Sequence, residues 1–265
     1  MTILLAAVDD SAACRPILEV GRWAADVIGA QLVGVHVQRD GSGETARATA
    51  QLLDVPLLVR NGEVVAEIRA ATEELHAAGL AVGARAFPGS ATPAGHVALA
   101  LAKETAIPMI VVPPEAANHA VDRILIGLDR DGDSEIVLAL AERLSPIDPP
   151  DIVAVHVIGP DALPPFGDDP AFEAEVWARE LLRQASNRAA ARVHLDLRVG
   201  DPAVQVCEAV RDLHADLVVL AWHHDLGGGR ARIVRRVLET VRVPLVLLSA
   251  QPAQTTVGAG SEGRS

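Results

Sequence analysis

Two glycine-rich stretches carry the strongest chemical signal in this sequence. The first runs from Gly83 to His96, and the second holds Gly227 to Gly229 followed by Arg230. A glycine-rich loop that leads into a helix leaves backbone N–H groups free to hold an anion, and the helix dipole strengthens that attraction. Both stretches are therefore candidate phosphate-binding loops. For the second one we favour the simpler interpretation, a surface turn before a basic helix.

Carboxylate and imidazole side chains accompany the apolar runs of the sequence. Asp9 and Asp129 each follow such a run, where a carboxylate could contact a ligand or cap the next helix, and both interpretations stay open. His36 and His156 lie inside apolar runs, so buried histidines with satisfied hydrogen bonds are favoured over ligand-binding ones. His96 could donate to a phosphate, but its cation would oppose the helix dipole, which disfavours that role.

No residue spacing predicts a metal site or a catalytic centre. Cys14 and Cys207 lie far apart, so buried free thiols in a reducing compartment are expected instead of a disulfide. The adjacent histidines His223 and His224 have no cysteine or carboxylate at a metal-ligand spacing. The sequence also lacks a Gly-x-x-x-x-Gly-Lys-Ser/Thr motif and a nucleophile–base spacing.

These candidate groups occur in a sequence that repeats itself. Asp9 is followed 120 residues later by Asp129, and His36 is followed at the same distance by His156. Two further landmarks recur in the same order. They are Gly200 and Pro244, which correspond to a glycine and a proline of the first half. Four ordered landmarks with small drifts in spacing indicate a duplicated domain.

Each repeat alternates apolar runs with amphipathic stretches, which is typical of parallel βαβ units. The fold class expected is α/β, with two tandem five-stranded parallel-sheet domains. In the first repeat the expected strands are 3–8, 31–37, 55–59, 80–87 and 108–112, and the expected helices are 12–28, 45–53, 64–78 and 97–105. In the second repeat strands are expected from 123, 152, 193, 216 and 243, and helices from 134, 172, 202 and 233. The expected domains are 1–114 and 119–250, with a disordered tail at 251–265.

Bulk composition excludes some classes of partner. The formal net charge is −12, which disfavours nucleic-acid binding because that depends on Lys and Arg neutralising phosphates. No apolar run approaches the roughly 20 residues of a membrane span, and the N-terminus lacks the basic region of a signal peptide. We therefore expect a cytoplasmic protein that binds neither nucleic acid nor membrane.

The order of elements, the strand ending Val8-Asp9-Asp10-Ser11 and the loop from Gly83 to His96 resemble the universal stress protein family in its tandem form. The resemblance covers residues 1–250 and implies an adenine-nucleotide α-hydrolase-like, Rossmann-like fold. It also implies that the last strands of the two repeats, 108–112 and 244–248, meet across a pseudo-twofold axis.

The resemblance further implies candidate nucleotide-binding residues in each domain. In domain 1 these are Asp9, Val37, Gly83, Ala86, Gly95, His96 and Val97. Ala86 and His96 depart from the family pattern, which has Gly and Ser/Thr there. In domain 2 the candidates are Asp129, Val157, Gly228, Gly229 and Arg230. The loop of domain 2 has Ala221, His224, Ala231 and Arg232 at the pattern positions, so its site is expected to be degenerate.

The function implied is that of a regulatory stress-response protein that binds ATP or a related adenine nucleotide in domain 1. Magnesium would enter only with the nucleotide, and hydrolysis would be very slow at most. The alternative is a nucleotide-free module of the same family that dimerises or docks a partner. A protein partner or self-association is expected in either case.

Overall fold

The computed structural model describes residues 1–38, 43–84, 96–116, 121–128, 150–159, 193–222 and 229–249. The sequence expectations for helices from 134 and 172 and for the tail at 251–265 lie outside these ranges. Within them, no helix is both long and apolar enough to cross a membrane.

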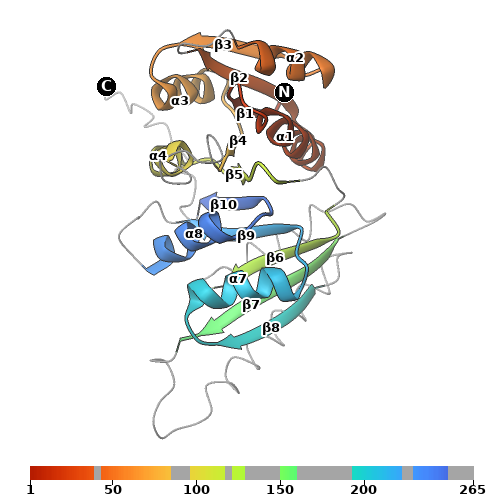
Figure 1. Cartoon of the computed structure of the whole chain (residues 1–265), viewed down its shortest axis with the longest axis vertical. Coiled ribbons are helices and arrows are strands. Elements are labelled where there is room, and N and C mark those ends of the chain that lie inside the picture. The colour runs from red at the N-terminus through yellow and green to blue at the C-terminus, as the bar shows by residue number, and fades with distance from the viewer. Residues whose placement is uncertain are drawn as a thin grey trace, which may run out of the picture.

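The chain forms two successive sets of strands and helices (Figure 1). The first half contains β1 (Ile3–Val8), α1 (Cys14–Ile28), β2 (Gln31–Gln38), α2 (Glu44–Leu52), β3 (Leu57–Asn61), α3 (Val64–Glu74), β4 (Gly79–Gly83), α4 (His96–Glu104) and β5 (Met109–Val112). The second half contains β6 (Arg123–Leu128), β7 (Asp151–Ile158), β8 (Val193–Val199), α7 (Pro202–Asp212), β9 (Leu217–Trp222), α8 (Gly229–Thr240) and β10 (Leu245–Ser249).

The strands join into one ten-stranded sheet with the order β3-β2-β1-β4-β5-β10-β9-β6-β7-β8. Each half contributes five parallel strands, which confirms the tandem parallel architecture. The halves meet where β5 and β10 pair antiparallel, with Val111 opposite Leu245 and Met109 opposite Leu247. Figure 1 shows this junction between the upper and lower halves. The last strands therefore meet as expected, but they fuse the two sheets into one.

Helices cover both faces of this sheet, so the central strands are buried on both sides. The helices α3, α4, α7 and α8 share one apolar core that spans the two halves and includes Leu101, Leu220 and Leu245. The helices α1 and α2 enclose a second core on the other face of the first half. Burial on both faces explains why runs such as β1 are continuously apolar and do not alternate.

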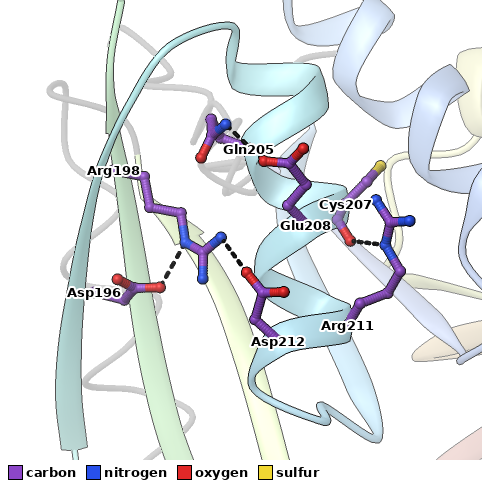
Figure 2. A network of polar contacts seen from close by, with 7 residues as sticks. All are labelled: Asp196, Arg198, Gln205, Cys207, Glu208, Arg211 and Asp212. Carbon is purple, nitrogen blue, oxygen red and sulfur yellow. Dashed lines mark hydrogen bonds and ion pairs between the residues drawn. The ribbon is translucent and has the colours of Figure 1, made fainter.

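The duplication extends to individual contacts of α3 and α7. Glu63 caps α3 by accepting hydrogen bonds from two backbone N–H groups of its first turn, and Asp201 caps α7 in the same way. An arginine–carboxylate pair links the preceding strand to the end of each helix. The pairs are Arg60–Glu74 in the first half and Arg198–Asp212 in the second, the latter drawn in Figure 2.

Several element boundaries differ from the sequence expectation. The third helix ends at Glu74, because Leu75 closes it and His76 adopts a positive φ of 46°. Gly79 consequently starts β4 and does not close a helix. The last helix begins at Gly229, four residues before the expected Ile233. The expected extension of β4 through residue 87 lies outside the described residues.

Candidate functional site

Strand order reverses once in each half, between β1 and β4 and between β6 and β9. In open α/β sheets, ligands bind outside the carboxyl ends of the strands at such a point. The register places Ala7 opposite Val82 and Gly127 opposite Leu220. The residues that follow, Asp9 and Gly83 in the first half, therefore lie on neighbouring strand ends.

Asp9 is held by a local turn. Its Oδ1 accepts hydrogen bonds from the backbone N–H of Ser11, at 3.1 Å, and from the Ser11 hydroxyl. The Ser11 Oγ in turn accepts from the N–H of Ala13, the N-cap residue of α1. Asp9 thus supports the start of α1 through Ser11 and does not cap the helix itself.

Asp10, which sequence reasoning did not single out, caps α2. Its Oδ1 accepts from the N–H groups of Thr45, at 2.7 Å, and Ala46, at 3.2 Å. Desolvation raises the pKa of Asp10, but these hydrogen bonds outweigh it and the pKa lies below its usual value. The Asp9-Asp10 pair was the only sequence feature that could have pointed to this cap. Nothing local links Asp10 to α2, because α2 begins more than thirty residues later in the sequence.

The two histidines of β2 and β7 are core residues, as the sequence favoured. The Nδ1 of His36 lies 3.0 Å from the carbonyl oxygen of Val8, and the Nδ1 of His156 lies 3.3 Å from that of Leu128. A carbonyl oxygen only accepts, so Nδ1 carries the hydrogen in both rings. Both residues are buried.

The other candidates of domain 1 fall partly within the described structure. Gly83 ends β4 opposite Val112, and Val37 is half-buried in β2. His96 is exposed at the first position of α4, and Val97 packs against the shared core. Ala86 and Gly95 lie outside the described residues.

Domain 2 contains a cavity of about 120 Å³ at its strand ends. The cavity is formed by the carboxyl ends of β6, β7 and β9 together with α7 and α8. Its lining residues are Gly127, Leu128, Val155, His156, Val157, Pro202, Val206, Leu220, Ala221, Ile233 and Val234. His156 is the one ionisable side chain among them, so the cavity favours an apolar or flat group over a charged one.

Only part of the predicted domain 2 site lines this cavity. Val157 does, whereas Asp129 and Gly228 lie outside the described residues. Gly229 and Arg230 begin α8, so they belong to a helix and not to the expected turn. Arg232 forms an ion pair of 2.7 Å with Asp201, the cap of α7.

Known proteins share this architecture. Residues 120–249 match the model of the universal stress protein family. A universal stress protein from Archaeoglobus fulgidus has 15% identity and a TM-score of 0.63, covering 94% of this chain and 98% of its own. A protein of unknown function from Pseudomonas aeruginosa PAO1 has 14% identity and a TM-score of 0.61, covering 94% and 92%. A protein from Pseudomonas aeruginosa UCBPP-PA14, proposed to be a universal stress protein, has 13% identity and a TM-score of 0.62, covering 94% and 93%. No curated protein matches the sequence.

The paired parallel units and their two strand-end sites define a tandem α/β protein of the Rossmann-like class. The match of residues 120–249 shows a domain of the universal stress protein family, and the whole chain shares the two-domain fold of the Archaeoglobus fulgidus protein. The resemblance inferred from the sequence is therefore confirmed.

Proposed function

We propose that this protein is a regulatory stress-response protein that binds ATP or a related adenine nucleotide at the strand-end site of domain 1. The observation that carries this proposal is the placement of Asp9 and Gly83 on adjacent strand ends, where strand order reverses. Two free buried thiols fit a cytoplasmic setting, where reducing conditions keep cysteines unpaired.

The side chains at two corresponding positions around this point are smaller in domain 1 than in domain 2. Gly83 corresponds to Ala221 at the end of the central strand, and Ala98 corresponds to the larger Val234 of the following helix. Val234 and Ala98 both pack against the shared core, with relative exposures of 1% and 2%. A glycine at a strand end lets a ligand approach the backbone closely, which supports domain 1 as the nucleotide site.

The cavity in domain 2 favours a second candidate function. Its apolar lining fits a small flat or apolar group, and it has one histidine to orient such a ligand. In that case domain 2 is a remade binding site. The remaining alternative is a nucleotide-free module that acts only through protein partners.

Calorimetric titration with ATP on a matched pair of variants separates these candidates. Gly83→Val adds a side chain at the domain 1 strand end, and Ala221→Val enlarges the side chain at the corresponding position of domain 2. We expect ATP affinity to fall about tenfold or more in Gly83→Val and to be unchanged in Ala221→Val, because only the first blocks the nucleotide. The reverse result would assign the nucleotide to domain 2, and no heat in the parent protein would favour the nucleotide-free module.

We further propose that bound ATP is not turned over at an enzymatic rate. Phosphoryl transfer needs a metal ion and a group that orients the attacking water, and residues 83–97 contain no carboxylate. Steady-state hydrolysis should stay well below about one turnover per second, the low end of ordinary enzymes. A faster rate that disappears in Gly95→Val would contradict this part of the proposal.

A further inference from the structure

Some arginines of the second half lack the partners that other arginines have. Arginines with a carboxylate partner include those of the pairs Arg60–Glu74, Arg198–Asp212 and Arg232–Asp201. Arg235, Arg236 and Arg242 are exposed and, in the part of the chain that the structure describes, form neither an ion pair nor a hydrogen bond. Among the described residues, Arg211 donates to the Cys207 carbonyl oxygen, at 3.3 Å, and forms no ion pair. We call Arg211, Arg235, Arg236 and Arg242 the basic patch.

The basic patch lies on the packed helices α7 and α8 and on the segment that follows α8. Figure 2 shows Arg211 on the side of α7 away from Asp212, so it does not join the Arg198 ion pair. Burial raises the pKa of the Cys207 thiol, and the charges of Arg236 and Arg211 act against that rise. Both guanidinium groups therefore lie within electrostatic range of Cys207.

The first half of the molecule shows that the fold does not need these arginines. The corresponding residues of α3, α4 and the segment after α4 are Glu73, Leu99, Ala100 and Ala106. Those helices pack on the same shared core as α7 and α8. The duplicated half therefore builds the same layer with no cation at any of these four positions.

Some charges of α8 do not favour the helix. Arg236 stands four residues after Arg232, where like charges repel, although Asp201 pairs with Arg232 and Glu239 stands four residues after Arg235. The first turn of α8 has no acidic residue, although negative charge is what the helix dipole favours there. Exposed cations that the duplicated half lacks, and that the fold therefore does not require, indicate a role in binding.

We propose that the basic patch is a docking surface for an acidic segment of a partner protein. Exposed guanidinium groups bind carboxylates bidentately, and four of them match a short acidic stretch. Arg211 lies in the last turn of α7 and Arg242 precedes β10, so both lie toward the amino ends of the strands, whereas Arg235 and Arg236 directly follow the cavity-lining Ile233 and Val234 in α8. None of the four arginines lines the cavity itself.

Charge arithmetic favours a protein segment over a longer polyanion. Nucleic acids and anionic membranes present extended negative charge, and this chain carries a net charge of −12. Non-specific nucleic-acid binding depends on how many phosphates Lys and Arg neutralise, and the basic patch offers four cations for this. A short acidic segment can contact the basic patch without approaching the negatively charged remainder of the surface, which stays in solvent.

The test measures binding of a fluorescein-labelled oligoglutamate peptide by fluorescence anisotropy at low ionic strength. The variant is the double substitution Arg235→Glu and Arg236→Glu in the full chain. The matched control is Arg15→Glu, which reverses an exposed arginine of α1 on the other face of the sheet. Circular dichroism confirms that each protein is folded, and Arg235→Ala with Arg236→Ala serves as a milder variant.

We expect the double reversal to weaken peptide binding about tenfold or more, the alanine pair to weaken it less, and the control to leave it unchanged. Binding in the parent should also weaken as salt is added. Equal affinity for all four proteins, or no binding by the parent, would overturn the proposal. Tighter binding of duplex DNA through the same arginines would mean that the partner is a nucleic acid and not an acidic protein segment. A salt-sensitive dimer in sedimentation, lost in the double reversal, would replace it by a second copy of the chain.

Discussion

The central strands of the two halves differ in a pair of side chains that compensate each other. In the first half Ala7 lies opposite Val82, whereas in the second half Gly127 lies opposite Leu220. A Cβ added to Gly127 would lie 2.6 Å from the Leu220 Cδ2 atom, so the larger leucine occupies the space that the alanine methyl fills in the first half. The combined size of the two side chains is therefore the same in both halves, although both residues differ.

The surfaces of the two halves have diverged without such compensation. With their caps, α3 and α4 carry five carboxylates and two cations, whereas α7 and α8 carry four carboxylates and five arginines. Close packing constrains the interior, since a change of one methylene is felt there. Surface charge and strand-end chemistry were free to change, which is why function can differ between halves that share a fold.

The largest expected effect concerns the strands where the halves join. Met109 and Leu245 occupy corresponding places in β5 and β10, with exposures of 2% and 1%. Met109→Ala and Leu245→Ala should each lower the free energy of unfolding by about 2–5 kcal/mol, because each leaves a cavity in the shared core. Urea denaturation should show one transition in both variants. Two separate transitions would mean that the halves fold independently, and Leu52→Ala, at 73% exposure, is the neutral control.

The two buried thiols should contribute unequally to the loss of stability at alkaline pH. Burial, reinforced by the charges of Asp9 and Asp10, raises the pKa of Cys14 from 9.0 to about 11, whereas Arg236 and Arg211 oppose the rise at Cys207. The folded state then holds its proton longer than the unfolded state, so stability present below pH 9 is lost as the pH rises toward 11. We expect a loss of about 2 kcal/mol from Cys14 across this range.

Urea midpoints measured across this range would check the alkaline prediction. Cys14→Ala should flatten the decline more than Cys207→Ala does. The chain contains no tyrosine, so no phenol titrates in the same window. Equal flattening by both variants would contradict the difference inferred between the two thiols.

One hydrogen bond between the halves has no counterpart across the pseudo-twofold axis. The Trp222 indole N–H donates to the Ala102 carbonyl oxygen in the last turn of α4, at 2.8 Å, and Ala84 stands at the corresponding place in the first half. Trp222→Phe should lower the free energy of unfolding by about 1–3 kcal/mol, because a buried bond between the halves is lost. Thermal unfolding of Trp222→Phe beside the parent protein checks this. An unchanged midpoint would show that the bond does not hold the halves together.

The smallest effect concerns the two helix caps. Glu63→Ala and Asp201→Ala should each lower the free energy of unfolding by about 1 kcal/mol, because each removes a carboxylate that accepts from two N–H groups. Asp201→Ala should cost slightly more, since it also removes the exposed ion pair with Arg232. Chemical denaturation of both variants checks this, and a larger loss in Glu63→Ala would contradict the extra role of Asp201.

Much of the fold was predictable because its signals are local. Strands buried on both faces read as continuous apolar runs, and β1 lies where its run predicted. The boundary errors are also local: Arg and Ala continue a helix well, so α8 starts before its apolar pattern does. Gly79 looked like a helix end, yet His76 had already closed that turn with a positive φ.

The site was harder to predict because its contacts join distant parts of the sequence. Asp10 caps a helix that begins at Glu44, and Trp222 bonds to Ala102, so neither contact has a nearby sequence signal. The domain 2 cavity depends on how strands and helices of the second half pack, and its apolar residues are indistinguishable from core in the sequence. The nucleotide roles of Asp9, Val37 and Gly83 stay predictions.

Native mass spectrometry of the full chain with ATP tests most directly the claim that the halves share a fold but differ in binding. The parent protein and Ala221→Val should each carry one nucleotide per chain, and Gly83→Val should carry none. Two nucleotides on the parent, or one nucleotide retained by Gly83→Val and lost from Ala221→Val, would contradict the account.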